Sequence, residues 1–290
     1  MTRTIAASAA TALASGKSKL TRCLRLDLRD DTSLGFTSLD VDIELNLGDS
    51  PGTVTYLSGT GILPSDISLS VGLEADNIEV SGPIGAVVSR AAILGGRYDR
   101  ARAYVFDYDF GSSPSIIRLL FGKVTQARIE AGEFVLEIRS ASDAFNQTIG
   151  RVFGPMCTHE LGDAKCTAVV ATYAAEVASV TDDLTFDVTW TDSPAPTVSD
   201  LVNGKVEFTS GDLLGTLPIE IWGFSGSTIT LYSPTAELPQ VGDTLTVSDG
   251  CDKTRATCRD RFANMLNFGG WPDSPGTANV VKYAIPGSSA

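Results

Sequence analysis

Apolar residues alternate with polar ones over many short stretches of the chain. Spacing of two residues places one face of a β-strand on a core and the other toward water or a neighbouring chain. Runs of this kind occupy residues 41–47, 67–73, 104–110, 134–138, 184–190, 219–221, 229–231 and 245–247. Glycine and proline turns separate them, as at residues 48–52. The pattern predicts a mainly β protein built from small barrels or sandwiches.

Helical spacing is confined to three short stretches. The first is an Ala-rich arm at residues 5–15, which lacks the leucine-rich core of a secretory signal. The second covers residues 84–94, and the third covers Arg255–Leu266, where Cys258, Phe262 and Met265 share one face. Gly269, Gly270 and Pro272 follow and prevent the third helix from continuing. No apolar run approaches the ~18 residues that span a bilayer.

The amino-acid composition disfavours several classes of function. The 290 residues are 43% apolar and 20% charged, which is typical of about two packed domains. The net charge is −13, so a broad phosphate-binding surface or a polybasic membrane patch is disfavoured. His159 is the one histidine, which leaves little room for a His-based triad or a multi-His metal centre.

The negative charge is concentrated in one region. Residues 167–250 hold 12 acidic residues and one basic residue, Lys205, a net of −11, whereas the other 206 residues carry −2. This shift predicts an amino-terminal β domain at 1–150, a discontinuous module at 151–166 plus 251–290, and an inserted acidic β domain at 167–250. Since the ends of an insertion lie close in space, a shared site would hold them together.

Four cysteines bracket the acidic insert. Cys157 and Cys166 precede it, and Cys251 and Cys258 follow it. Cys23 stands apart in the first strand region and is expected to be a small buried hydrophobe. The spacing favours metal ligation by four thiolates over two disulfides or unlinked core residues, and all three stay open. Neither gap is the C-x₂-C of zinc ribbons, so spacing does not identify the metal.

Basic residues crowd the second cysteine pair. Lys253, Arg255, Arg259 and Arg261 lie within ten residues of one another. Guanidinium and ammonium groups would stabilise an anionic metal–thiolate group. A solvated helix face with ordinary ion pairs explains the same residues equally well.

Two other function classes compete with a structural role. Cys157 and His159 could form the thiol–imidazole pair of a cell-wall-degrading enzyme, but such pairs normally come from distant positions. His159 is therefore expected to be an ordinary loop residue. Trp190, Trp222 and Tyr232 could stack on the sugar rings of a host-surface glycan. Aromatic residues in alternating strands are more often core, so we expect these three to be buried.

Several segments carry residue runs typical of one family. The run Cys251–Phe262, with Asn264 and the Asn-Phe-Gly-Gly-Trp-Pro at 267–272, resembles the carboxy-terminal end of the tail-tip hub proteins of gene transfer agents and lambda-like long-tailed phages, which include the L-type minor tail proteins. Cys157–Cys166 resembles their C-x-x-x-L-G-D-x-x-C element. Segments 35–40, 75–82 and 95–101 are similar to the amino-terminal domain of the gene-transfer-agent branch. The acidic insert matches only in its β pattern.

The resemblance implies a cofactor and a place in a particle. It implies a [4Fe–4S] cluster held by Cys157, Cys166, Cys251 and Cys258, with zinc as the alternative, and no catalytic residues. It also implies a homotrimer of small β-barrel domains at the tail tip or baseplate of a virion assembled in the host cytoplasm. The implied neighbours are a hexameric ring of distal tail protein and a central, megatron-like tip or fibre protein. The tape measure protein and a tail peptidase are further candidate partners, and neither sequence-specific nucleic-acid binding nor stable membrane insertion is expected.

Overall fold

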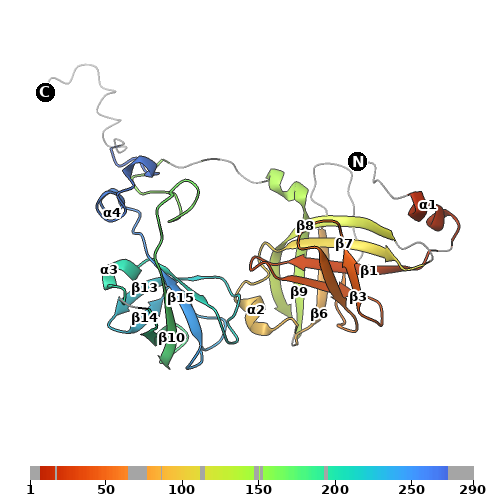
Figure 1. Cartoon of the computed structure of the whole chain (residues 1–290), viewed down its shortest axis with the longest axis horizontal. Helices are drawn as coiled ribbons and strands as arrows, with labels where there is room; N and C mark the ends of the chain where they lie inside the picture. The colour runs from red at the N-terminus through yellow and green to blue at the C-terminus, as the bar shows by residue number, and fades with distance from the viewer. Residues whose placement is uncertain are drawn as a thin grey trace, which may run out of the picture. The chain divides into compact units, whose positions relative to one another are not determined.

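The computed structural model describes residues 7–16, 18–64, 77–85, 87–111, 115–146, 150, 153–192 and 195–273 of the chain. The chain divides into two compact units. Unit 1 comprises Met1–Thr148 with Asp212–Leu217, and unit 2 comprises Ile149–Gly211 with Pro218–Ala290. Strands dominate both units, which confirms the predicted mainly β class (Figure 1).

Unit 1 is built on a nine-stranded sheet. Its elements are α1 (Ala7–Ala14), β1 (Leu20–Asp27), β2 (Ser33–Thr37), β3 (Ile43–Asn46), β4 (Thr53–Leu57), β5 (Leu63–Pro64), β6 (Asn77–Pro83), α2 (Arg90–Leu94), β7 (Arg102–Asp109), β8 (Ser115–Glu130), β9 (Glu133–Ser140) and η1 (Ala141–Asn146). The strand order is β3-β4-β2-β1-β7-β8-β9-β6-β5. The β2–β4 pair is parallel. The predicted strand at 67–73 lies outside the described residues.

Both faces of this sheet are covered, because β1 buries side chains on each side. Leu24 and Leu26 join the larger core. Cys23 points into a second core with Tyr56 and Phe106, whose rings meet edge to face at 5.5 Å. Cys23 is fully buried, and this burial raises the pKa of its thiol to about 11. The residue therefore packs as the small hydrophobe that the sequence predicted.

Unit 2 contains a closed six-stranded barrel. Its elements are β10 (Thr172–Val180), β11 (Thr185–Trp190), α3 (Val198–Leu201), β12 (Lys205–Phe208), β13 (Ile219–Ser225), β14 (Thr228–Leu231), β15 (Thr244–Ser248), α4 (Arg255–Asp260) and η2 (Met265–Asn267). The strands close in the order β10-β11-β14-β13-β12-β15. Val206, Ile221, Ile229 and Val247 are fully buried, and the alternate positions face outward. All six strands fall within 167–250, where the inserted domain is predicted; its boundaries stay a prediction.

Two predicted helices are too long. The predicted helix Arg255–Leu266 ends at Asp260, because Ala263 takes φ 47° and the amide of Asn264 turns back to the carbonyl of Cys258 at 2.9 Å. In the predicted 84–94 stretch only Arg90–Leu94 is helical. Before it, the amide of Gly85 donates to the carbonyl of Val88, which forms a turn instead. The predicted amino-terminal arm contains α1.

Candidate metal centre

Two segments of unit 2 lie side by side beyond one end of the barrel: the chain before β10 and the chain after β15 (Figure 1). The amide of Cys157 donates to the carbonyl of Lys253 at 2.9 Å, and the amide of Trp271 donates to the carbonyl of Gly154 at 2.7 Å. The rings of Phe153 and Trp271 pack with centroids 4.4 Å apart. Residues far apart in the sequence thus form one structural module.

The four cysteines of this module line one cavity, whose other walls include Leu161, Phe262 and Asn264. These four are Cys157, Cys166, Cys251 and Cys258. All five cysteines of the chain are free thiols. Among the described residues, no group of three or more His, Cys, Asp or Glu side chains is arranged to hold a metal ion. The structure places the four predicted ligands around one cavity but not in the arrangement of a metal site, so their role as ligands stays a prediction.

Asp163 shapes the loop that carries the first cysteine pair. Its Oδ1 accepts hydrogen bonds from the amides of Lys165 at 2.9 Å and Cys166 at 2.5 Å. Its Oδ2 accepts from the amide of Glu160 at 3.2 Å. These donors, led by Cys166, lower the pKa of the Asp163 carboxyl. Gly162 takes φ +79°, and a Cβ there would meet a Val170 methyl at 2.5 Å. The Leu-Gly-Asp sequence is thus a turn that sets the position of Cys166.

Thr254 and Asp252 form the helix cap that lies between Cys251 and Cys258. Thr254 precedes α4, and its Oγ1 accepts from the amide of Thr257 at 3.3 Å. Asp252 Oδ1 accepts from the amide and the hydroxyl of Thr254, each at 2.9 Å. This capping starts the short helix that buries Cys258. Cys251 lies just before the cap and is half-buried.

The cysteine sulfurs have hydrogen-bond contacts within the module. The amide of Gly269 donates to Cys157 Sγ at 3.3 Å. Asn264 Nδ2 lies 3.7 Å from Cys166 Sγ and also donates to the carbonyl of Cys166. Cys258 Sγ donates to the carbonyl of Asn264 at 3.3 Å. Asn264 therefore contacts one cysteine from each segment, and N–H donors of this kind orient metal-ligating sulfurs.

Of the four predicted basic residues, Lys253 lines the cavity. Arg255 pairs with Asp273 at 2.9 Å, and Arg259 pairs with its neighbour Asp260 at 2.6 Å. Arg261 pairs with Asp249 at 3.0 Å and with Asp200 at 3.4 Å. It also donates to the carbonyl of Gly250 at 2.8 Å. Arg261 thus fastens the end of α4 to the end of the barrel.

The chemistry of the cavity fits a metal–thiolate group. Burial raises the pKa of the Cys258 thiol, and the sulfurs of Cys157, Cys166 and Cys251 raise it further. Burial also raises the pKa of the Cys251 thiol, while Lys253 opposes the shift. A bound cation would offset the repulsion among four thiolates. Four soft sulfur donors are typical ligands of zinc and of iron–sulfur clusters, so the residues fit either group.

His159 has a structural contact. Its Nδ1 donates to the carbonyl of Asn267 at 3.1 Å, across the two segments. Cys157 Sγ accepts from Gly269 instead. Both residues thereby join the segments, as expected for a loop histidine.

The prediction that the barrel aromatics are core residues is wrong for two of the three. Trp190 is half-buried and packs between Tyr173 and Phe224, with ring centroids 6.3 Å and 5.8 Å away. Trp222 is 62% exposed and Tyr232 is 56% exposed. Each follows a residue that points into the barrel, so strict alternation places it outside. The sequence contains the signal for this exposure, because Ile221 and Leu231 are the apolar residues that occupy the inward positions directly before Trp222 and Tyr232.

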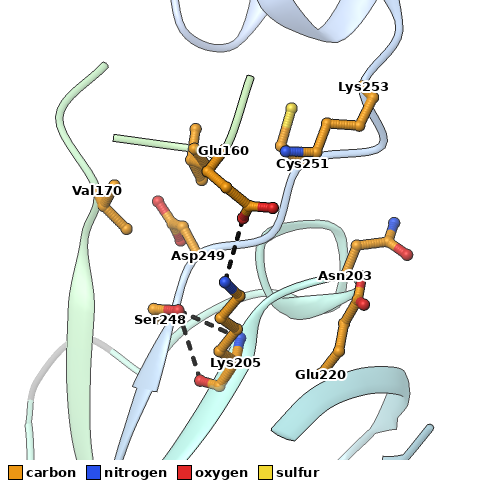
Figure 2. Close-up of a pocket in the computed structure, with 10 residues that line it drawn as sticks. Glu160, Val170, Asn203, Lys205, Glu220, Ser248, Asp249, Cys251 and Lys253 are labelled. Carbon is orange, nitrogen blue, oxygen red and sulfur yellow. Dashed lines mark hydrogen bonds and ion pairs between the residues drawn. The ribbon is translucent and has the colours of Figure 1, made fainter. Parts of the chain in front are cut away.

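A polar cavity that the sequence did not predict adjoins the cysteine cavity. It holds about 310 Å³ and shares Leu161, Cys251 and Lys253 with the cysteine cavity (Figure 2). Lys205 Nζ crosses it to Glu160 Oε2 at 3.1 Å. The sole basic residue of the acidic region therefore links the barrel to the module.

In the described part of the chain, no helix combines the length and the apolar character needed to cross a membrane.

Two family models and a chain of a solved structure are similar to this chain. Residues 6–169 match a family model described as baseplate hub protein, N-terminal attachment domain. Residues 201–278, which include Cys251 and Cys258, match a model described as phage conserved hypothetical protein BR0599. A chain of a solved structure, the virion of a native gene transfer agent particle, is similar at 26% identity over 98% of each chain, with a TM-score of 0.81. No curated protein matches.

Proposed function

The chain belongs to the baseplate hub proteins that carry the N-terminal attachment domain, and we propose that it is a structural hub at the tail tip of a phage-like particle. The similarity that carries this proposal is to a chain of a gene transfer agent virion, because it extends over 98% of both chains. A structural joint requires β surfaces that meet neighbouring chains. The alternating outer faces of the barrel strands β10 and β11 supply such surfaces. We assign it no catalytic residue.

The proposed hub joins rings of different symmetry. Three copies would form a closed ring between a hexameric ring of distal tail protein and a central, megatron-like tip protein. Rings of this kind are built from head-to-tail contacts between different faces of neighbouring subunits. Counting copies in purified particles by electron cryomicroscopy tests the proposal. Three copies around a threefold axis are expected, and six copies would contradict the trimeric arrangement.

We further propose that Cys157, Cys166, Cys251 and Cys258 hold a [4Fe–4S] cluster, with zinc as the less favoured alternative. The observation that supports ligation is that all four thiols line one cavity. The preference for iron–sulfur over zinc comes from the resemblance of the two cysteine segments to tail-tip hub proteins. When bound, the cluster would supply metal–thiolate bonds that cross-link the two segments.

A cross-link here would stabilise unit 2 through its unfolded state. The chain between Cys166 and Cys251 contains the whole barrel. Closing a loop of that length restricts the unfolded chain by about 4–5 kcal/mol in the loop-entropy model. Helix α4 has six residues and is too short to be stable alone, since isolated helices below ~12–15 residues are marginal. The proposed cluster therefore acts as a clamp on the module.

A further inference from the structure

We propose that the outer face of the barrel in unit 2 binds a neutral oligosaccharide. One sugar would occupy the polar cavity beside Lys205, and the next would stack on Tyr232 and Trp222. This binding function is separate from the hub role and from the cysteine cavity. It rests on the volume and lining of the polar cavity, on the strand register beside it, and on the two exposed aromatic side chains.

The polar cavity has the size and the groups that a sugar requires. Its volume of about 310 Å³ lies at the lower end of the range for small-molecule sites. Asn203, Glu220, Ser248 and Asp249 line it and offer amide, carboxylate and hydroxyl groups (Figure 2). Planar amide and carboxylate groups can pair with neighbouring hydroxyls of one sugar ring. The cavity is thus suited to a polyol ring rather than to an apolar ligand.

The pairing of neighbouring strands places Tyr232 next to a residue that lines the polar cavity. Lys205 on β12 lies directly opposite Glu220 on β13. The amide of Tyr232 donates to the carbonyl of Glu220 at 2.9 Å, so Tyr232 is the next residue in the same row. Neighbouring strands lie about 4.8 Å apart. Tyr232 therefore stands one strand beyond the cavity wall, within the length of a disaccharide.

Trp222 extends the same face along β13. It lies two residues after Glu220, and the intervening Ile221 is fully buried in the barrel. The pairing of β13 with β14 shifts between Ile221 and Gly223, and such a bulge redirects side chains. Trp222 and Tyr232 thus expose flat rings beside a polar cavity. Aromatic rings with one apolar face and a polar edge pack against the C–H faces of sugars.

The surrounding charges select the ligand. The core of a protein–protein interface is depleted of charged residues. Here Lys205 and Glu220 are charged and exposed, and they lie in the same row as Tyr232, on neighbouring strands. This favours a hydrated glycan over a protein partner. The barrel region carries a net charge of −11, which disfavours acidic sugars by repulsion. The ligand class is therefore neutral hexose oligomers, including N-acetylated ones.

Titration calorimetry on the full chain tests the proposal. The probes are maltohexaose, cellohexaose and chitohexaose, with an oligogalacturonate of similar length as the acidic comparison. At least one neutral probe should bind at millimolar or lower concentration, and the acidic one should not. Trp222→Ala and Tyr232→Ala should each weaken binding roughly tenfold, as expected for loss of one stacked ring. Glu220→Gln should weaken it several-fold.

The matched control is Leu238→Ala, which removes another exposed apolar side chain of unit 2. It should leave the affinity unchanged. Absence of binding by all three neutral probes would overturn the proposal. So would unchanged affinity in Trp222→Ala, or tighter binding of the acidic probe. A change in oligomeric state of Trp222→Ala without any glycan affinity in the unmodified chain would assign the pair to a protein contact instead. Circular dichroism of each variant separates loss of binding from loss of folding.

Discussion

Lys253 donates from Nζ to the carbonyl oxygen of His159 at 2.6 Å. The carbonyl of Lys253 also accepts from the amide of Cys157 at 2.9 Å. One residue between Cys251 and the α4 cap thus holds the opposite segment by both its side chain and its backbone. Lys253 also lines the cysteine cavity, where burial raises the pKa of the Cys251 thiol while the backbone hydrogen bond and the charge of Lys253 oppose that rise.

Removing this ammonium should loosen the module. Lys253→Gln is expected to lower the free energy of unfolding of unit 2 by about 1–3 kcal/mol, because the carbonyl of His159 loses a charged donor. Urea denaturation followed by tryptophan fluorescence measures the change, because Trp190, Trp222 and Trp271 all lie in unit 2. Lys165→Gln is the matched control, since Lys165 is an exposed lysine of the same module. Equal stability of the two variants would show that the hydrogen bond from Lys253 to the carbonyl of His159 does not stabilise unit 2.

Asn264 should set how firmly the proposed cluster is held. Asn264→Asp keeps the size and the acceptor for Asn267 but removes the donor to Cys166 and adds a negative charge. Loss of such a supporting contact typically lowers metal affinity by about 10- to 100-fold. The rate at which a chelator bleaches the visible absorbance of the reconstituted protein reports the effect. Leu266→Ala, at a fully exposed site, should bleach like the unmodified chain. A bleaching rate in Asn264→Asp equal to that control would contradict the role of Asn264.

Unit 1 contains a buried positive charge, Arg25, whose carboxylate partner is neutralised at low pH. The guanidinium of Arg25 is fully buried, donates twice to Asp49 at 2.9 Å, and lies 4.2 Å from the ring centroid of Tyr104. The hydrogen bond from Arg25 lowers the pKa of the Asp49 carboxyl below 3.8. Because the folded pKa is depressed, the stabilisation is complete above about pH 4 and is lost as the pH falls through the folded value.

Asp49→Asn should therefore destabilise unit 1 at neutral pH by about 1 kcal/mol, because solvent screens the third of the Asp49 side chain that is exposed and Asp27 still pairs with Arg25. It should also flatten the decline in stability below pH 4. Thermal unfolding of the full chain from pH 7 to pH 3 measures both effects. Glu44→Gln, on the exposed face of β3, is the control and should change neither. If the stability of Asp49→Asn declined below pH 4 as steeply as that of the unmodified chain, Asp49 would not be the source of this pH dependence.

Some features of the fold follow from the sequence and others do not. Alternation predicted β11, β13, β14 and β15 of the barrel, because buried positions such as Val188 and Leu245 leave a local signal at every second residue, but it did not predict β10 or β12. The end of α4 left no such signal, since the left-handed turn at Ala263 depends on the contacts of Asn264 with both segments. Arg25 interrupts an apolar strand, and its partner Asp49 lies 24 residues away in the loop between β3 and β4.

The candidate site was predictable in its residues and not in its surroundings. The two cysteine pairs stand out because they bracket a region of different charge. The roles of Asp163 and Lys253 follow only from the geometry, because acidic and basic residues are abundant in the chain. The polar cavity arises where barrel and module meet, so no single segment carries its pattern.

Loss of the proposed clamp should have a local effect. Removing the cluster is expected to lower protection from hydrogen exchange in residues 153–166 and 250–271 together, because each segment is held mainly by the other. The core strands β1 and β7 of unit 1 should keep their protection. Exchange followed by mass spectrometry on cluster-loaded and cluster-free protein makes the comparison. Unchanged protection in both segments would show that the cluster is not a structural clamp, and a redox or triggering role would then be favoured.

The metal and sulfide content of anaerobically purified protein tests the central claim most directly. Protein made with ample iron should be brown and contain iron and acid-labile sulfide in equal amounts, about four of each per chain for a [4Fe–4S] group. Cys258→Ser should lose most of both, whereas Cys23→Ser, which changes the buried thiol of unit 1, should keep them. Stoichiometric zinc without sulfide, or a disulfide at Cys157 in intact particles, would contradict the iron–sulfur clamp.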